Sequence, residues 1–305
     1  MPARCYGTST VIRRFGQAYL RTDSSGALAC RGVRIAYDRV GTGPPLLLVH
    51  GIGMCKEVWR PVLPLLARER EVVAVDMPGF GASPPGPGTV EGLAEALADF
   101  AAGLGLERPH VAGNSLGGGV ALAMGANGTA RTVCALSPIG FVAGREKAYG
   151  RAMIAGTRGV AVAIAPVVPK LARSSVMRTL LSAHATARPW RIPPEDAVHW
   201  TEAYAQAPAF WELLKSLDGW HAPVPACPTT VAWGERDRLL IFSRQAPRAR
   251  RRLPAAHHVV LRGCGHVPTW DDPDQVASAL LSASRPAEAP RRSAPEYSSP
   301  SAPRP

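Results

Sequence analysis

A serine, an aspartate and a histidine stand in sequence contexts where they could form a nucleophilic site. Ser115 lies in "GNSLG", with Gly113 two residues before it and Gly117 two residues after it. A serine in a sharp strand-to-helix turn needs small neighbours at these positions, because bulky side chains would clash with the strained backbone. His266 lies in "GCGHVP" and Asp237 in "GERD". A serine nucleophile needs a base to take its proton and an acid to orient that base, so these residues predict acyl transfer.

The serine motif taken alone permits a second interpretation, as a glycine-rich turn that binds a phosphate or a dinucleotide. Such turns carry a Lys-Ser/Thr pair or a G-x-G-x-x-G spacing. Neither pattern occurs at residues 110–119, "HVAGNSLGGG". An apolar run precedes the serine and a run of small residues with helical character follows it, which favours the nucleophile interpretation.

Short apolar runs recur along the chain, separated by segments with helical character. The runs lie at 33–40, 45–51, 71–79, 109–115, 131–140, 229–237 and 257–266. This alternation predicts an α/β fold with a mostly parallel central sheet flanked by helices. Parallel strands end at one edge of the sheet, where ligands bind. Ser115, Asp237 and His266 each follow the apolar core of such a run, so we expect their side chains to converge.

The sequence "HGIG" at 50–53 follows another of these runs. A turn at this place can direct a backbone N–H at a substrate oxygen and, together with the N–H of Leu116, form an oxyanion hole. His50 is a second candidate for the base. It stands directly at the strand end, and His266 has the better loop context, so we assign His50 a structural role.

The sequence divides into a core and three other segments. Residues 33–141 and 223–283 carry the strand pattern, and residues 142–222 show helical stretches with no convincing strand, which predicts an insertion that is either a lid or a small subdomain. Its aromatic residues predict either an apolar face over the site or a small core of the insertion itself. Residues 1–32 are interpreted as an N-terminal extension. Residues 284–305 are rich in Pro, Ser, Ala and Arg, which predicts a disordered tail.

Composition narrows the functional class. The net charge of +12 comes mostly from scattered arginines, and the one cluster, at 244–252, has no interleaved aromatic residues, so nucleic-acid binding is not expected. The six cysteines show no metal-type spacing, and we expect neither a metal nor a cofactor. Arg13-Arg14 and the run ending at Cys30 lack the apolar segment of an export signal, and 159–169 is too short to span a membrane. We expect a cytoplasmic protein without a membrane partner, and leave homo-oligomer formation open.

Five motifs occur in order along the chain: "HGIG" (50–53), "DMPGFGAS" (76–83), "GNSLGG" (113–118), "WGERD" (233–237) and "GCGHVPTWDDP" (263–273). This series resembles the α/β-hydrolase family over about residues 33–281. The resemblance implies the α/β-hydrolase fold and the roles of nucleophile for Ser115, acid for Asp237 and base for His266. It also implies an oxyanion hole made by the backbone N–H groups of Ile52 and Leu116, and an inserted helical cap at 142–222. Structural motif positions are His50, Gly51, Gly53, Gly113 and Gly117; Asp76 is also structural, and Glu235 is the alternative acid.

The nucleophile type indicates the reaction. Relatives that open epoxides or haloalkanes use aspartate, whereas a serine favours acyl transfer to water from a small-molecule substrate. We expect a hydrolase of small-to-medium apolar carboxylic esters, with lactones and thioesters as related substrates. The elbow is also similar to that of meta-cleavage-product hydrolases, with Asn114 as the hint, so C–C bond hydrolysis is the second hypothesis. A perhydrolase-like activity, and a non-hydrolytic tailoring enzyme or binding protein on the same fold, stay open.

Overall fold

The computed structural model describes residues 9–15, 18–30 and 33–285, with side chains described for 25–29 and 33–285. Its elements are, in chain order, β1 (Ser9–Phe15), β2 (Ala18–Cys30), β3 (Val33–Val40), β4 (Pro45–Val49), η1 (Lys56–Trp59), α1 (Leu63–Leu66), β5 (Glu71–Val75), α2 (Val90–Gly103), β6 (His110–Asn114), α3 (Leu116–Ala126), β7 (Thr132–Leu136), α4 (Glu146–Ile164), α5 (Val168–Leu171), α6 (Ser175–Ser182), η2 (Pro189–Arg191), α7 (Pro194–Gln206), α8 (Phe210–Ser216), β8 (Thr229–Gly234), α9 (Phe242–Arg252), β9 (His257–Leu261) and α10 (Pro273–Ala283).

The strands form one sheet in the order β1-β2-β3-β5-β4-β6-β7-β8-β9. Strands β5, β4, β6, β7, β8 and β9 pair in parallel, and β3 joins β5 antiparallel. Each apolar run of the sequence contains one of the strands from β3 to β9. The predicted α/β fold with a mostly parallel sheet is therefore confirmed.

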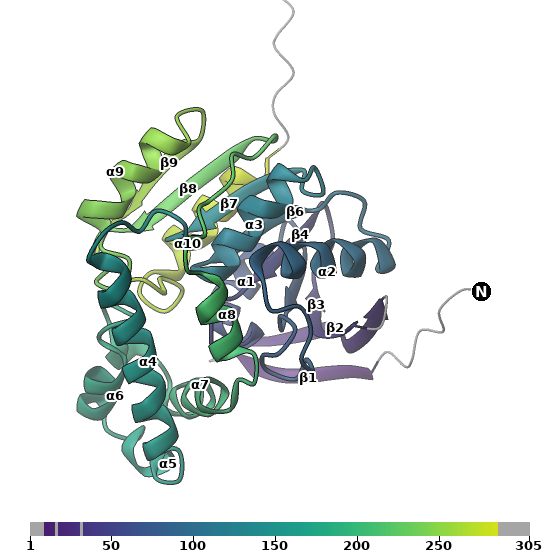
Figure 1. Ribbon diagram of the computed structural model, residues 1–305. Helices are drawn as coiled ribbons and strands as arrows, with labels where there is room; N and C mark the ends of the chain where they lie inside the picture. Colours follow the sequence, from purple (N-terminus) through teal and green to yellow (C-terminus); the bar gives the residue numbers. More distant parts are fainter. Residues whose placement is uncertain (1–8, 16–17, 31–32, 286–305) are drawn as a thin grey trace, which may run out of the picture.

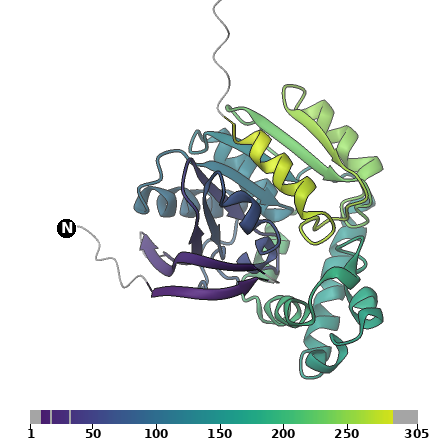
Figure 2. The same ribbon diagram turned by 180° about the vertical axis from the view of Figure 1, so that it is seen from behind.

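Helices cover both faces of the sheet (Figures 1 and 2). Along β4, Leu47 and Val49 belong to the apolar core that contains residues of α2, α3 and α9, whereas Leu46 and Leu48 belong to the core under α1 and α10. This alternation follows from the period of two along a strand, and a strand buried on both faces reads as one continuous apolar run. Helix α2 begins where Thr89 caps it, with the Thr89 hydroxyl accepting from the Gly92 N–H.

The chain ends are partly structured. Within residues 1–32, for which the sequence shows no period, β1 and β2 pair with each other and β2 pairs with β3 along seven residue pairs, extending one edge of the sheet. At the other end, Ser284 is buried and its hydroxyl accepts from Arg70 Nε at 3.0 Å. The folded part of the chain therefore extends to Ser284, the first residue of the predicted tail. The remainder of the predicted tail, 286–305, lies outside the described residues.

The helices from α4 to α8 form the insertion between β7 and β8, and most of them lie beside the sheet rather than against either of its faces (Figure 1). Two of its aromatic residues, Trp200 and Tyr204, line a cavity, whereas Phe210 is buried in the main core with residues of α3. The arginine cluster of α9 contributes to the attachment, since Arg248 donates from Nη1 and Nη2 to Glu146 of α4 at 2.6 and 2.9 Å.

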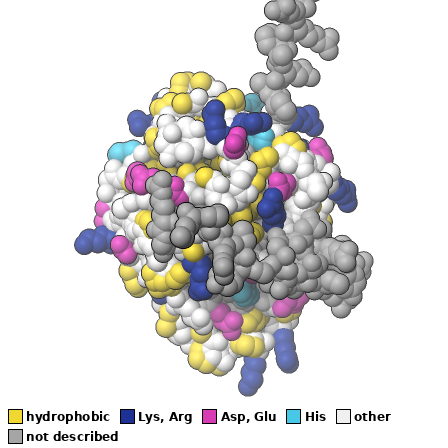
Figure 3. All heavy atoms as spheres, turned by 90° about the vertical axis from the view of Figure 1, so that its right-hand side faces the viewer, with side chains coloured by type: hydrophobic (Ala, Val, Ile, Leu, Met, Phe, Trp, Pro, Cys, Tyr) yellow, Lys and Arg dark blue, Asp and Glu magenta, His cyan; other side chains and the backbone are white. Residues whose placement is uncertain are grey.

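Surface charge and helix hydropathy relate to two expectations from the sequence, namely scattered basic residues and the absence of a membrane-spanning segment. On the face seen in Figure 3, the Lys and Arg side chains are spread apart among acidic and apolar ones. In the part of the chain that the structure describes, no helix has both the length and the hydropathy needed to cross a membrane.

Candidate active site

Ser115 occupies the turn between β6 and α3. Its backbone has φ 57° and ψ −115°, a combination that non-glycine residues rarely adopt and that marks a strained functional position. The turn is tight enough to require small neighbours. A Cβ on Gly113 would lie 2.0 Å from the Gly117 carbonyl oxygen, and a Cβ on Gly117 would lie 2.2 Å from the Val49 oxygen. The glycines on either side of the serine therefore permit the strand-to-helix turn that places Ser115 in the wall of a cavity.

His266 and Asp237 meet at the same edge of the sheet. His266 Nδ1 lies 2.8 Å from Asp237 Oδ2, and both side chains are buried. The other carboxylate oxygen of Asp237 accepts from the backbone N–H groups of Leu239 and Leu240 at 3.0 and 2.8 Å. Two backbone donors thus fix the carboxylate, and the carboxylate in turn fixes the imidazole with Nδ1–H directed at it. This leaves Nε2 available for proton transfer.

Contacts that the sequence did not reveal hold the His266 loop from two sides. Asn114, the residue before the nucleophile, donates from Nδ2 to the carbonyl oxygens of His266 and Leu136 at 2.9 and 3.1 Å. The insertion contributes the carbonyl of Ala185, which accepts from the Val267 N–H at 2.7 Å. The loop that carries His266 is therefore tied both to the Ser115 turn and to the inserted helices.

Asp271 is a third support of this loop. Its fully buried carboxylate accepts from the backbone N–H of Gly265 at 2.7 Å and from those of Ala187 and Arg188 at 3.0 and 2.6 Å. The sequence held one clue to this role. Asp272, the next residue, caps α10 by accepting from Gln275, so the first acid of the "DD" pair remains for an inward contact.

The "HGIG" turn lies beside the nucleophile. A Cβ on Gly51 would come 3.3 Å from the Ser115 Cβ, and Ile52 lines the same cavity as Ser115. His50 is fully buried; its Nε2 accepts from the Met77 N–H at 2.9 Å, and its Nδ1 lies 2.8 Å from the Gly51 oxygen. Burial lowers the pKa of His50, so it is a neutral ring engaged at both nitrogens, as expected for a structural residue.

Two further carboxylates that the sequence singled out, Asp76 and Glu235, have partners away from His266. Asp76 accepts from the backbone N–H groups of Lys56 and Ala82 at 2.7 and 3.0 Å, consistent with a structural turn. Glu235, the alternative acid, is exposed, accepts from the Gly263 N–H and pairs with Arg262. Its carboxylate is engaged away from His266, whereas that of Asp237 contacts the His266 ring.

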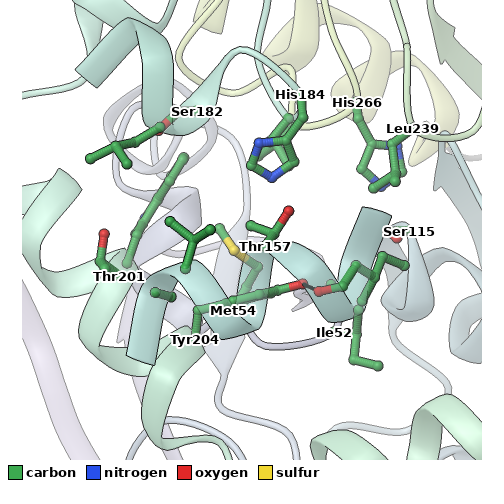
Figure 4. A pocket seen from close by; sticks show the side chains of 18 of the residues that line it. Ile52, Met54, Ser115, Thr157, Ser182, His184, Thr201, Tyr204, Leu239 and His266 are labelled. Atoms are coloured by element: carbon green, nitrogen blue, oxygen red, sulfur yellow. Dashed lines mark hydrogen bonds between the residues drawn. The ribbon is translucent and has the colours of Figure 1, made fainter. Parts of the chain in front are cut away.

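A cavity, the Ser115 cavity, lies between the sheet edge and the insertion (Figure 4). Its wall contains the aromatic side chains of Trp200 and Tyr204 from α7 and aliphatic side chains from α4. Its full lining is Gly51, Ile52, Met54, Asn114, Ser115, Ile154, Thr157, Val160, Ala161, Ile164, Leu181, Ser182, His184, Ala185, Trp200, Thr201, Tyr204, Leu239, His266 and Val267. None of these is Asp, Glu, Lys or Arg, so the described wall offers an apolar surface with a few hydroxyl groups.

His184 is a cavity residue that the sequence reasoning missed. It follows α6 and faces the interior of the cavity on the side of His266 (Figure 4). Burial, and secondarily the proximity of His266, lowers the pKa of His184, so this ring is neutral near pH 7. The insertion thus places a neutral imidazole on the side of the cavity where His266 lies.

One group of side chains in the described residues has the composition of a metal site. Ligand atoms of Cys55, Glu57 and His199 lie within 4.8 Å of one another. The Lys56 ammonium already lies 2.9 Å from Glu57 Oε1 and 3.5 Å from Asp76 Oδ2. A metal ion would have to compete with this cation for the same carboxylate, so the cluster is better described as an ion-pair network.

Comparison with known proteins supports the architecture. The curated relatives include an uncharacterized protein of Mycobacterium tuberculosis, 27% identical over 84% of this chain and 81% of its own. A pimeloyl-[acyl-carrier protein] methyl ester esterase of Aeromonas hydrophila is 45% identical over 28% of this chain and 34% of its own. A 2-hydroxymuconate semialdehyde hydrolase of Pseudomonas sp. strain CF600 is 39% identical over 30% of this chain and 35% of its own.

Solved structures with a similar fold include the following two. A bacterial membrane phospholipase A superposes with a TM-score of 0.66 at 27% identity, covering 85% of this chain and 86% of its own. A thermophilic esterase from Thermogutta terrifontis gives 0.64 at 22% identity, covering 85% and 97%. The family model described as "Alpha/beta hydrolase family" matches residues 46–279. The chain belongs to the alpha/beta hydrolase family and is a hydrolase.

Proposed function

We propose that this hydrolase cleaves neutral, apolar carboxylic esters through an acyl-enzyme on Ser115. The observation that carries the proposal is the arrangement around one cavity: Ser115 in a strained elbow, and His266 hydrogen-bonded through Nδ1 to the buried Asp237 at 2.8 Å. This is the order of contacts that activates a serine hydroxyl, with the acid orienting the base and the base facing the nucleophile.

The proposed reaction has two half-reactions. Ser115 Oγ attacks the ester carbonyl carbon while His266 Nε2 takes the hydroxyl proton. The tetrahedral intermediate collapses, the C–O bond to the alcohol breaks, and the imidazolium returns the proton to the leaving alkoxide. Water then attacks the acyl-enzyme with His266 as base, which releases the acid and regenerates Ser115.

Two backbone donors are proposed for the oxyanion. Leu116 is the first residue of α3, and the first four N–H groups of a helix have no acceptor within the helix. Ile52 belongs to the turn whose Gly51 packs against Ser115. An N–H from each, directed at the developing negative charge, contributes about 10²–10³ in rate per donor.

The wall of the Ser115 cavity favours a neutral substrate. Carboxylate-bearing substrates, such as the dienoates of meta-cleavage hydrolases, call for a basic group to pair with the acid. The described lining contains no Lys or Arg. The local similarity to a 2-hydroxymuconate semialdehyde hydrolase keeps C–C hydrolysis as the second candidate, but the apolar wall ranks the ester first.

The insertion at 142–222 is proposed to act as the cap of the site, because α4 and α7 supply most of the cavity wall opposite the sheet. Lactone and thioester cleavage use the same chemistry and fall within the proposal. Cytoplasmic location, independence of cofactors and homo-oligomer formation stay predictions from the sequence.

A labelling and turnover experiment tests the function. We expect the wild type to react with a fluorophosphonate probe and to hydrolyse p-nitrophenyl butyrate, and Ser115→Ala to lose both. Turnover should fall by at least about 10³-fold, because the remaining rate comes from binding and the oxyanion donors alone. Absence of labelling and turnover in the folded wild type contradicts the serine-hydrolase proposal. Labelling without ester turnover indicates a tailoring or binding role, and preferential turnover of a vinylogous diketone indicates C–C hydrolysis.

A further inference from the structure

A second cavity adjoins the Ser115 cavity on the side of the insertion, and we call it the α4–α6 cleft. Its walls come from α4 and from α6 with the residues that follow it: Tyr149, Ala152, Met153, Gly156, Thr157, Val160, Leu180, Leu181 and His184. Four of these, Thr157, Val160, Leu181 and His184, also line the Ser115 cavity. The two hollows therefore share a boundary made of the same side chains.

Helix α4 presents one side to each hollow. Ile154, Ala161 and Ile164 face the Ser115 cavity, whereas Met153 and Gly156 face the cleft. Residues three and four apart lie on one side of a helix, so these sets form two neighbouring stripes along α4. Thr157 and Val160 lie where the stripes meet. A ligand that leaves the Ser115 cavity at this line enters the cleft without crossing the helix.

The cleft offers an apolar surface. Among its described lining residues none is Asp, Glu, Lys or Arg. Its hydroxyl donors are already used: Thr157 donates to the Met153 oxygen at 2.8 Å, and Tyr149 donates to the Arg238 oxygen at 2.8 Å. A polar or charged ligand would find few partners here, whereas an alkyl chain would lose only its contact with water.

Side chains at the cleft are left uncovered in the free protein. Val160 is 49% exposed and Leu180 is 69% exposed, although both are large apolar residues that line the cleft. Contiguous exposed apolar surface next to a binding cavity marks a place where a ligand or partner removes it from water. Because the two hollows share four lining residues, an extension of the substrate bound at Ser115 is the ligand that fits both.

We propose that the substrate is a long-chain ester whose distal alkyl segment lies in the α4–α6 cleft, with His184 and Thr157 at the passage between the two hollows. This inference rests on the proposed function, because it places the reacting ester at Ser115. It adds the substrate class: a neutral ester with one alkyl chain too long for the Ser115 cavity.

Gly156 gives the inference a specific test. It lines the cleft but not the Ser115 cavity, and a Cβ added there would meet nothing within 4 Å. Glycine in a helix interior costs about 1 kcal/mol relative to alanine, so local helix stability does not explain its presence. A large side chain at this position has room to be accommodated by the fold, and it would occupy the space that we assign to the alkyl chain.

The experiment compares Gly156→Phe with two matched variants. Gly156→Ala also replaces the helix glycine by a better helix former, but adds little volume. Gly159→Phe adds the same ring to the same helix at a position that lines neither hollow and is also open to a Cβ. Substrates form two pairs, p-nitrophenyl butyrate with p-nitrophenyl laurate and butyl acetate with dodecyl acetate. The long chain lies on the acyl side in the first pair and on the alcohol side in the second, and all are used below their aggregation concentrations.

In the wild type we expect kcat/KM to be higher for at least one long-chain ester than for its short-chain counterpart (p-nitrophenyl butyrate or butyl acetate). In Gly156→Phe this advantage should fall by at least about tenfold, since each buried methylene contributes about a fourfold gain. Butyrate turnover should stay within about twofold, and Gly156→Ala and Gly159→Phe should behave as the wild type. The inference is overturned if long and short esters fall together, or if neither long ester responds to Gly156→Phe.

A binding measurement separates this inference from the proposed function. The Ser115→Ala protein is titrated with two neutral probes, N-dodecyl and N-butyl dansylamide, followed by fluorescence anisotropy. We expect the dodecyl probe to bind more tightly and to lose this advantage when Gly156→Phe is added. Loss of labelling and turnover with chain-length-dependent binding intact refutes only the ester chemistry. Labelling and butyrate turnover without chain-length dependence refute only the cleft.

Discussion

Asn114 connects the Ser115 elbow to the loop of His266, the proposed nucleophile and base. Its Nδ2 donates to the carbonyl oxygens of His266 and Leu136, so one side chain sets the distance between the elbow and the histidine loop. The sequence suggested Asn114 only as a hint of substrate type. The contacts give it a positioning role that is independent of the substrate.

Replacing Asn114 by alanine should therefore lower kcat more than it raises KM. The variant leaves the His266 carbonyl without this donor, whereas the Leu136 carbonyl still accepts from the Ser115 N–H at 3.0 Å. Each missing bond costs about 1–3 kcal/mol, part of which appears as displacement of His266. We expect kcat to fall about 10- to 100-fold, with a parallel fall in the rate of fluorophosphonate labelling. Asn114→Asp, which keeps the shape but replaces the donor by an acceptor, should be at least as impaired. A variant that labels and turns over at the wild-type rate would refute the positioning role.

At the scale of the elements, the apolar runs of the sequence predicted the strands β3 to β9, but some predicted runs extend beyond the last residue of the strand. The run predicted at 71–79 contains β5, Glu71–Val75, and the run predicted at 257–266 contains β9, His257–Leu261. After β5 the chain stays buried in a turn through Asp76 and Met77, so the sequence continues to resemble a buried strand. Burial, rather than backbone conformation, is what an apolar run reports.

Other elements depend on partners that a local pattern does not encode. Strands β1 and β2 carry no clear alternation, and they exist in the sheet because β2 pairs with β3. Strand preference reflects packing against neighbours more than an intrinsic tendency of the residues. The same limit explains the site: Ser115, Asp237 and His266 could be found by residue type, whereas the support of His266 runs through backbone atoms, which have no sequence signature.

The attachment of α7 to the core should depend on pH. His199 Nε2 lies 3.3 Å from Glu57 Oε2, and Arg60 pairs with Asp196 of the same helix. The Glu57 carboxylate at this distance raises the pKa of His199 above its usual 6.5, although burial, Arg60 and Lys56 oppose this. Burial alone would raise the pKa of Glu57, but His199 and Lys56 lower it overall, so Glu57 stays ionised at neutral pH.

The direction of the pH dependence follows from these pKa shifts. A histidine with a raised pKa in the folded state stabilises it fully below its unfolded value, about 6.5, and loses this contribution as the pH rises through the folded value. We expect α7 amides to exchange faster, after correction for intrinsic rates, as the pH rises through this window. The effect should stay below about 1 kcal/mol because the side chain is 44% exposed. His199→Gln should abolish the pH dependence, and an equal dependence in both proteins would contradict the ion pair.

At the scale of the whole molecule, Asp271 joins three parts of the fold. Its carboxylate accepts from Gly265 in the histidine loop and from Ala187 and Arg188 in the insertion, and its carbonyl oxygen accepts from the Arg188 and Arg191 guanidinium groups at 2.8 Å. Because it is buried at the start of α10, the sheet, the insertion and the site share one anchoring residue.

Asp271→Ala should consequently destabilise the protein and uncouple the insertion from the sheet. Three buried N–H donors lose a charged acceptor, and hydrogen bonds to charged groups contribute about 1.5–3 kcal/mol each, so a loss of about 2–4 kcal/mol after relaxation is expected. Asp274→Ala, an exposed acid on the same helix, should change stability by less than about 0.5 kcal/mol. Chemical denaturation followed by tryptophan fluorescence and by α4 hydrogen exchange measures both effects. Unfolding of the Asp271→Ala variant at the wild-type midpoint, with α4 exchange unchanged, would show that the insertion is held to the sheet by its other contacts, such as the Glu146–Arg248 pair.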